Sequence, residues 1–525
     1  MQRILRIVLL LLYFSAAAFA QKPDWVKEYG KSISYPEQLY LTGFGMHKVT
    51  GGIDRATSLR KATESARGNL IQSVRVSLQS TSGMIVEERN QRISSYFSSA
   101  TQATSSMEIQ GLELKTFYDD DEEMSYALAY VSRAHLASLY KEKESKLRKS
   151  IRQSLDAGKT DEEQGLKTKA LDEYLACYPL FRQLEEAQAI LLAVRTGTVK
   201  AIAELEGDMA KDEVDESAIR EAVRRLVQRP MVSAEDLAWY LAYCLKEQLN
   251  LKEATLLVTP FTYRDTKMGS PFSRFFKQVL ESRVAEVARW TPVQQDLKSR
   301  SLEIVGDTIR SPQADYILRG TYWERENGIK FISTFQRVSD GKMIGSAEAV
   351  IDTSILEKTP LSLKPQNFAA ALSDQKQFGK DEALPSGLSL EVWTNKGTDD
   401  LVFSKGERMQ AYVRVNMPCY IRFIYHLADG KRALLVDNHY IDQSKVNRVY
   451  PIPEEFECDE PFGAEFLQAF ARTEEFEPVH TQEVEGYKIL QEDLERFLAS
   501  QRGMKKVKRD TLQAETRLVM TTVGE

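Results

Sequence analysis

The strongest constraint on the fold comes from glycine-containing dipeptides that separate runs of apolar or alternating residues. Asn327-Gly328 separates ADYILRGTYWE from IKFISTFQRV, and Asp340-Gly341 separates the latter from MIGSAEAVID. Asn-Gly and Asp-Gly readily adopt the positive φ angles of tight hairpins. The sequence therefore predicts an antiparallel β-meander in this part of the chain.

An apolar strand and an amphipathic helix precede this meander. ATLLVTPF at residues 254–261 is short enough for a buried strand. The helix after it carries one apolar stripe, formed by Phe272, Phe275, Phe276, Val279, Leu280 and Val287. Aromatic residues at helical spacing usually face a sheet, so we expect this stripe to form the core of an α/β domain at 251–353.

Residues 21–133 predict a small α/β roll in which a helix covers a curled sheet. YLTGFG at 40–45 predicts a strand, and the alanine-spaced stretch after it predicts a helix. SVRVSL at 73–78 alternates polar and apolar residues, which predicts a half-buried strand. LELKTFY and YALAYVSR predict two further strands, separated by an acidic turn at 119–123.

Two motifs in this roll superficially suggest ligands. The acidic turn lacks the D-x-[DN]-x-[DN]-G spacing of a calcium loop, so we interpret it as a solvated hairpin turn. Gly43 and Gly45 have no third glycine at the place that a pyrophosphate cradle requires. The sequence thus gives no support for calcium or nucleotide binding here.

Residues 134–250 have the pattern of a charged helical spacer. ASLYKEKESKLRKSIRQSL is amphipathic, and Gly158 after it is a helix stop signal. A second helix is expected to end at Pro179, because proline lacks the N–H that a helix interior requires. Ser233 with Asp236 predicts a cap for the apolar helix LAWYLAYCL.

The C-terminal part of the chain predicts a linker followed by a β-sandwich. The polar, proline-containing stretch 354–386 is expected to be cut by proteases, releasing a stable C-terminal piece. From 387 to 525, GLSLEVWTNK, MQAYVRVN and CYIRFIYHLADGKRALLV alternate as strands do. A helix, LQEDLERFLASQ, and a basic stretch are expected to close an α+β multidomain chain.

The first 20 residues predict a cleaved signal peptide. Arg3 and Arg6 precede the apolar run 7–14, and Ala18-Phe19-Ala20 has the small-x-small pattern of a cleavage site. The run is too short to span a bilayer stably. We expect a mature chain that starts at Gln21 without a transmembrane segment. It would be secreted across the inner membrane and be periplasmic or outer-membrane associated.

Charge and cysteine content narrow the choice of ligands. Loss of Arg3 and Arg6 takes the formal net charge from −6 to −8, which argues against nucleic acid as a main partner. No CxxC or HExxH occurs, so we expect no metal and no cofactor.

Cys419 and Cys458 lie in one β-rich region, and in an oxidising compartment they either form a disulfide or remain buried thiols.

One grouping could in principle support nucleophilic catalysis: Cys419 with His426 or His439, and Asp437. Cys419 follows Pro418 within a strand pattern, and not at an exposed elbow or helix N-terminus that would lower the pKa of its thiol. We therefore assign packing or surface roles to these residues and predict no catalytic residue.

Three regions resemble known families. PDWV, YLTGFG and GLELKTFYDDDEEMSYALAYVSR resemble the LPP-twenty outer-membrane lipoproteins and the N-terminal domain of FlgT. TLLVTPF, the helix after it and QADYILRGTY resemble the N-terminal domain of TolB and the CsgG and FlgT middle domains. GLSLEVWTNKG, FSKGERMQAYVRVNMPCYIRFIYHLADGKRALL and PFGAE resemble a β-rich family of unknown function numbered forty-three eighty-four. Together they imply a FlgT-like multidomain envelope protein. LPP-twenty members commonly carry a lipid-attached cysteine, which this chain lacks.

Two functions from different classes follow. The first is a non-enzymatic envelope scaffold or assembly factor that binds other envelope proteins, with peripheral outer-membrane or peptidoglycan association. The alternative is an exported hydrolase or peptidoglycan-acting enzyme with an unrecognised site. The sequence favours the first, because the usual polar constellations of enzymes are missing.

Overall fold

The structure is a computed structural model, and it confirms an α+β chain with several modules. It describes residues 22–524 except 50–53, 89–110, 195–198, 265, 294–302, 306–307, 311–313, 326–327, 340, 355–360, 380–387, 447, 485–486 and 492–510. The chain forms two compact units: Met1–Leu70 with Leu112–Val131, and the remainder. The expected signal peptide, at 1–20, lies outside the described residues.

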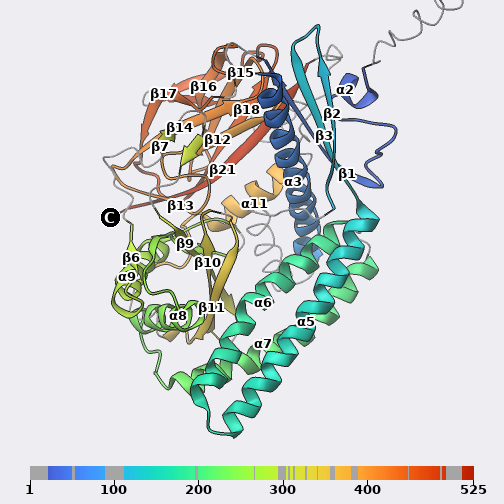
Figure 1. Ribbon diagram of the computed structural model, residues 1–525. Helices are drawn as coiled ribbons and strands as arrows, with labels where there is room; N and C mark the ends of the chain where they lie inside the picture. The colour runs from blue at the N-terminus through green and yellow to red at the C-terminus, as the bar shows by residue number, and fades with distance from the viewer. Residues whose placement is uncertain are drawn as a thin grey trace, which may run out of the picture. The chain divides into compact units, whose positions relative to one another are not determined.

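In the first unit a helix covers a three-stranded sheet, as expected (Figure 1). The sheet has the order β1-β3-β2, with β2 and β3 antiparallel. The elements are α2 (Asp24–Lys27), β1 (Tyr40–Lys48), the part of α3 (Arg55–Glu88) up to Leu70, β2 (Glu113–Asp119) and β3 (Met124–Ser132).

Two glycines bring the helix close to the sheet. A Cβ atom at Gly43 would lie 2.2 Å from the carbonyl oxygen of Ala66, and one at Gly45 would lie 2.1 Å from that of Ala62. Any side chain at either glycine would therefore push α3 away from β1. This packing explains the glycine pair in YLTGFG.

The strand expected at 73–78 is wrong, because these residues lie inside α3. Ala62, Ala66, Leu70 and Val74 are all fully buried. This four-residue spacing continues the helical stripe into the alternating segment as far as Val74, so burial of a helix face overrides the local strand pattern.

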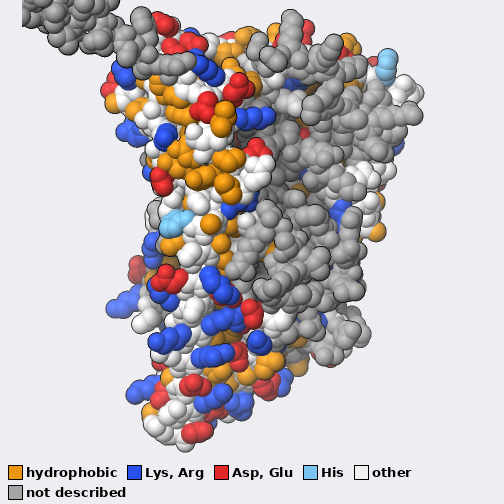
Figure 2. Space-filling view, turned by 90° about the vertical axis from the view of Figure 1, so that its right-hand side faces the viewer, with side chains coloured by type: hydrophobic (Ala, Val, Ile, Leu, Met, Phe, Trp, Pro, Cys, Tyr) orange, Lys and Arg blue, Asp and Glu red, His pale blue; other side chains and the backbone are white. Residues whose placement is uncertain are grey.

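Four long helices form the segment expected as a helical spacer. They are α5 (Arg133–Glu163), α6 (Lys167–Val194), α7 (Val199–Val227) and α8 (Ala234–Leu249). Ser233 caps α8 as predicted, accepting a hydrogen bond from the backbone N–H of Asp236 at 3.2 Å. Basic and acidic side chains are interspersed over the lower part of the face drawn in Figure 2.

Two expected helix ends in this segment are wrong. Helix α5 continues beyond Gly158, where a Cβ atom would lie 2.6 Å from the ring of Tyr174, so this glycine serves close helix packing. Helix α6 continues through Pro179. Buried residues after it, including Phe181 and Leu184, keep the chain helical and offset a proline cost of roughly 3 kcal/mol.

The α/β module contains the predicted meander. Its sheet has the order β11-β10-β9-β4-β6, with β5 beside β9. Strand β4 is parallel to β6 and β9, whereas β9, β10 and β11 are antiparallel. The elements are β4 (Thr255–Val258), β5 (Thr262–Tyr263), α9 (Pro271–Val287), β6 (Thr291–Pro292), β9 (Tyr316–Arg325), β10 (Gly328–Arg337) and β11 (Met343–Ile351). The strands β7 (Glu303–Val305) and β8 (Thr308–Arg310) form a separate pair.

Helices cover both faces of this sheet. The rings of Phe272 and Phe276 on α9 lie 5.8 and 5.5 Å from that of Phe331 on β10. The neighbouring Lys330 points to the opposite face, toward α7, because side chains alternate along a strand. The predicted stripe is confirmed at Phe272, Phe276 and Leu280, while Phe275, Val279 and Val287 are only partly buried.

Two sheets build the C-terminal β-sandwich. Their orders are β12-β14-β17 and β13-β21-β18-β15-β16-β20-β19, and β12 contacts β21 and β18 across the sandwich. The strands are β12 (Leu390–Thr394), β13 (Leu401–Ser404), β14 (Arg408–Val415), β15 (Cys419–His426), β16 (Arg432–Ile441), β17 (Tyr450–Glu457), β18 (Ala464–Arg472), β19 (Thr481–Val484), β20 (Tyr487–Leu490) and β21 (Gln513–Val523). The sequence analysis missed β21, which lies inside the larger sheet. Most of the helix expected before it falls at 492–510, outside the described residues.

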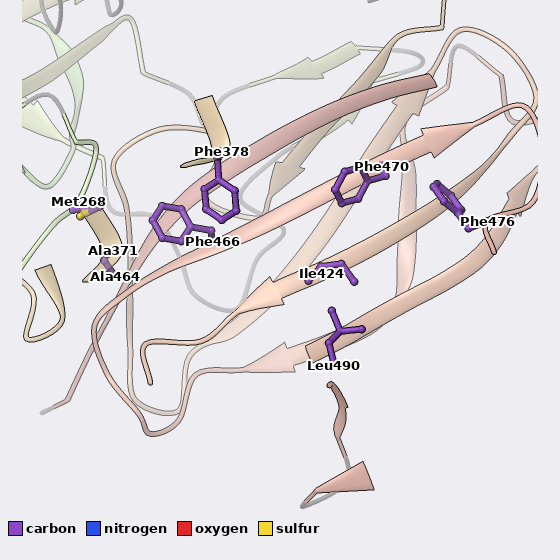
Figure 3. Packing of buried hydrophobic residues seen from close by; sticks show 9 residues of the cluster. All are labelled: Met268, Ala371, Phe378, Ile424, Ala464, Phe466, Phe470, Phe476 and Leu490. Atoms are coloured by element: carbon purple, nitrogen blue, oxygen red, sulfur yellow. The ribbon is translucent and has the colours of Figure 1, made fainter. Parts of the chain in front are cut away.

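The stretch expected as a linker contains α11 (Phe368–Gly379), which packs on the larger sheet. Phe378 is fully buried and lies 5.2 Å from the ring of Phe466 (Figure 3). Asn367 donates to the carbonyl oxygens of Ala428 and Ala464 at 3.0 and 2.8 Å. The linker prediction is therefore wrong for 361–379, where apolar residues at helical spacing are interleaved with polar ones.

Candidate functional site

The residues that could have formed a nucleophilic grouping do not assemble one. Cys419 and His426 lie at the two ends of β15, roughly 23 Å apart along an extended strand. Cys419 is buried, and burial raises the pKa of its thiol to about 12. Asp437 accepts from Nε of Arg422 at 2.7 Å and not from a histidine.

The second histidine of that grouping is also unconnected to the thiol. His439 lies opposite Ile421 on the paired strands, two pairs along from the pair of Cys419 with Ile441. Its ring lies 5.6 Å from that of Tyr450. Its buried Nε2 has no hydrogen-bond partner among the described residues, so the imidazole and the thiol form no nucleophile–base pair in this structure.

The two C-terminal cysteines are free thiols. The backbone N–H of Cys458 donates to the carbonyl oxygen of Glu407, just before β14 begins, whereas Cys419 follows the end of β14. An eight-residue strand separates the two positions by roughly 26 Å, and a disulfide needs Cα atoms within about 7 Å. The structure thus favours the alternative of two thiols.

His426 belongs to a buried hydrogen-bond chain that crosses three strands. Its Nε2 lies 3.0 Å from Oε1 of Gln468, whose amide donates to Glu515 at 2.7 Å. Arg517 lies beside Glu515 and donates to the carbonyl oxygen of Phe378 on α11 at 3.3 Å. Burial lowers the pKa of His426 to about 3, so the imidazole is neutral and helps to hold α11 on the sheet.

A buried ionic cluster joins the helical segment to the α/β sheet. Its members are Arg182 and Glu185 on α6, Glu216 and Arg220 on α7, Lys330 on β10 and Glu348 on β11. Lys330 Nζ lies 2.9 Å from carboxylate oxygens of both Glu216 and Glu348. Arg220 pairs with Glu348, and Arg182 pairs with all three glutamates.

Opposite charges in this cluster match one another, which makes its burial tolerable. Burial raises the pKa of Glu185 to about 7. Burial also acts to raise the pKa of Glu216, but Lys330 and Arg182 hold it well below its ordinary value. The sequence analysis missed this cluster, although charged residues inside the apolar strands IKFISTFQRV and MIGSAEAVID were a usable signal.

The position at which open α/β sheets usually bind ligands is filled by the chain itself. Strand order reverses at β4, and such a crevice at the carboxyl ends of the strands is the common ligand site. Here Thr259 donates to Asp400 at 3.0 Å, and the N–H of Gly269 donates to Thr521 Oγ1 at 2.8 Å. A Cβ atom at Gly269 would lie 2.5 Å from Val402. The sandwich therefore occupies this crevice.

Several sheet edges in the second unit are closed by the chain's own residues. The side-chain amide of Gln248 on α8 bonds to both the N–H and the carbonyl oxygen of Ser346 on edge strand β11, at 2.8 and 3.1 Å. On edge strand β13, Lys396 donates to the carbonyl oxygen of Val402 at 2.7 Å. Edge strand β17, with the sequence YPIPEEFE, carries two prolines that cannot donate to an added strand.

The edge of β2 in the first unit differs from these. No described residue bonds to the backbone groups on its outer side. An aromatic cluster lies beside it: the rings of Tyr35 and Tyr130 are 4.1 Å apart, and Lys115 on β2 lies 5.3 Å from the ring of Tyr35. In the same unit Ile33 is 92% exposed and Leu39 is 61% exposed. This edge is the candidate interaction site.

Two further properties bear on ligands. Among the residues that the structure describes, no group of histidine, cysteine or acidic side chains could hold a metal ion. No described helix is both long and apolar enough to span a bilayer.

Comparison with known proteins identifies one segment. Residues 402–475 match a domain of unknown function, DUF4384, which confirms the resemblance of the C-terminal region to this family. The likenesses to LPP-twenty, FlgT, TolB and CsgG stay predictions. No curated protein matches the chain.

The chain is weakly similar to solved structures. For the LpoB C-terminal domain from Salmonella enterica the identity is 17% and the TM-score 0.16, over 22% of this chain and 98% of that one. For the LpoB C-terminal domain from Escherichia coli the identity is 19% and the TM-score 0.15, over 19% of this chain and 82% of that one. For the secreted protein HP1454 from Helicobacter pylori the identity is 11% and the TM-score 0.20, over 64% of this chain and 97% of that one. At these TM-scores the likenesses carry no argument about function.

Proposed function

We propose that this protein is a non-enzymatic, exported envelope protein that serves as a scaffold or assembly factor for other envelope proteins. The observation that carries the proposal is the contrast among sheet edges. The chain's own residues close β11, β13 and β17, whereas no described residue pairs with the outer side of β2, which lies beside an aromatic cluster. Main-chain pairing at such an edge binds a partner without any catalytic group.

The internal connections of the second unit also support a scaffold. The ionic cluster fixes the helical segment on the α/β sheet, and the Thr259–Asp400 bond fixes that sheet on the sandwich. A platform whose modules are already ordered loses little conformational entropy when a partner binds. The proposal includes export by the N-terminal segment and peripheral association with the outer membrane or peptidoglycan.

Site-specific photo-crosslinking in intact cells tests this proposal. A photoreactive amino acid replaces Ile33 or Leu39, and replacement of Val214 on α7, which is 69% exposed, serves as the control. We expect irradiation to join the same exported protein to positions 33 and 39 and not to position 214. Mass spectrometry of the adduct identifies the partner.

Two results would contradict the proposal. One is an exported, folded protein that yields no adduct at either position of the first unit. The other is hydrolysis of purified peptidoglycan by the mature chain, abolished by a single substitution, which would establish the enzymatic alternative.

A further inference from the structure

We propose that the outer edge of β2 binds an extended segment of another protein as a fourth strand, with basic residues of that segment lying beside the acidic turn at 119–123. This inference rests on the proposed scaffold function and names the site and the chemistry of the partner. It is argued from the backbone, the two faces of the strand and the charge of the turn.

The backbone of β2 is available on one side. Its seven residues pair with β3 in continuous antiparallel register from Glu113 opposite Tyr130 to Asp119 opposite Met124. In such a strand alternate residues direct their N–H and C=O groups outward. Among the described residues none accepts from or donates to these outward groups, so they can pair with a further strand.

Each face of β2 presents an aromatic side chain to such a strand. On one face Phe117 lies 6.4 Å from the ring of Tyr126. On the other face the guanidinium of Arg55 lies 4.1 Å from the ring of Tyr118. Because side chains of neighbouring strands meet on the same face, an added strand would place alternate side chains beside Phe117 and Tyr118.

The end of the β2–β3 hairpin carries excess negative charge. Its acidic residues are Asp119, Asp120, Asp121, Glu122 and Glu123. Lys22 lies 3.0 Å from Asp119 and 2.9 Å from Glu122, and Arg55 lies 3.8 Å from Asp120. Among the described residues two cations pair with this group of five carboxylates, and the Asp120 side chain is 83% exposed. A strand that ends beside this turn is therefore favoured when its end is basic.

The same charges disfavour a second copy of this chain as the occupant. Antiparallel pairing of two β2 strands centred on Thr116 would place Glu113 of each copy opposite Asp119 of the other. Like charges directly opposite one another destabilise a strand pair. The geometry thus points to a different protein as the partner.

Defined peptides and the full mature chain provide the test. One soluble peptide alternates valine and threonine and ends in two lysines, and a second ends in two glutamates. We expect the lysine peptide to bind at least about tenfold more tightly. Hydrogen exchange should show new protection of the amides of residues 113–119 when it is bound.

Charge-reversed variants complete the test. We expect the double variant D120K/D121K to reverse the preference between the two peptides. The matched control D459K/E460K changes two adjacent acids on the sandwich that are 74% and 73% exposed, and should leave the preference unchanged. Circular dichroism and melting curves verify that each variant is folded.

Several results would overturn the inference. They are equal binding of both peptides, no binding of either, protection outside β2, or concentration-dependent dimerisation that protects β2 without a partner. In cells, a photo-adduct at position 33 that persists in D120K/D121K would leave the scaffold function intact and reject β2 as the docking edge. If no adduct forms even in the chain without the charge reversal, the scaffold function itself is rejected.

Discussion

At the scale of single residues, three contacts between buried polar side chains stand out in the second unit. His426 faces Gln468, Glu348 faces Lys330, and Asp400 faces Thr259. Each of these contacts joins two different elements of the chain. Burial within these joints is the largest cause that shifts the pKa of His426, Glu348 and Asp400.

The pH dependence of stability tests the environment of His426. Burial lowers the pKa of its imidazole from 6.5 to about 3 in the folded chain. Between these values the unfolded chain binds a proton that the folded chain does not, so the free energy of unfolding falls as pH falls through this window. We expect His426→Gln to remove this part of the fall. Urea unfolding at pH 7.5, 6 and 5 measures it, and parallel profiles for the two proteins would contradict the assignment.

Substitution in the aromatic core tests the role of α9. Phe276 is fully buried, with its ring 5.2 Å from that of Phe261 and 5.5 Å from that of Phe331. We expect Phe276→Ala to lower the free energy of unfolding by about 3–5 kcal/mol, because it removes a large side chain and leaves a cavity. Phe275→Ala on the same helix is the control and should cost less, since Phe275 is only partly buried. Equal losses in urea unfolding would show that the stripe is misassigned.

At the scale of elements, the two faces of the α/β sheet are covered by different helices. Helices α6 and α7 bring Arg182 and Glu216 to the sheet face that carries Lys330 and Glu348. On the opposite face α9 supplies aromatic residues. One face of the sheet is therefore fixed by paired charges and the other by apolar burial.

Removal of one charge tests the ionic joint. Glu348→Gln would leave Lys330 and Arg220 without a shared carboxylate inside the protein. We expect a loss of about 3–5 kcal/mol in the free energy of unfolding, because the three cations of the cluster would then face only two carboxylates and the excess buried charge is costly. Glu221→Gln breaks an exposed pair with Arg224 on the same helix and should cost less than about 1 kcal/mol. Similar costs for the two variants in urea unfolding would sink this assignment.

Local signals predicted elements well where a single backbone preference dominates. The two glycine dipeptides predicted the turns of the meander, and Gly328 and Gly341 have the positive φ angles expected there, 129° and 66°. The cap at Ser233 likewise follows from a short local pattern. The larger sheet was harder, because β21 pairs with β18 and β13, which are distant in the sequence. Only tertiary pairing distinguishes this strand from a polar tail.

The ionic cluster and the open edge could not be read from the sequence for a related reason. Lys330 and Glu348 each look like a solvated charge, and only the packing of α6 and α7 on the sheet makes them partners. The state of β2 depends on which strands lie beside it. Both sites are consequences of assembly and have no local sequence motif.

At the scale of the whole molecule, the two compact units differ in how they are held together. The second unit links helices, sheet and sandwich through polar contacts that are buried, such as Thr259 with Asp400 and Gly269 with Thr521. Modules that share such contacts should unfold together. We therefore expect the second unit to unfold as one cooperative transition.

A substitution at the junction of sheet and sandwich tests this cooperativity. A Cβ atom at Gly269 would lie 2.5 Å from Val402, so Gly269→Ala should force the two modules apart at a cost of about 1–3 kcal/mol. Calorimetry of the mature chain should then show the transition of the second unit split or broadened to lower temperature. Gly207→Ala on α7 is the matched control, since a Cβ atom there meets nothing within 4 Å. It should leave the transition unchanged or slightly higher, because alanine favours a helix. An unchanged single transition in Gly269→Ala would mean that the sheet and the sandwich are not coupled through this junction.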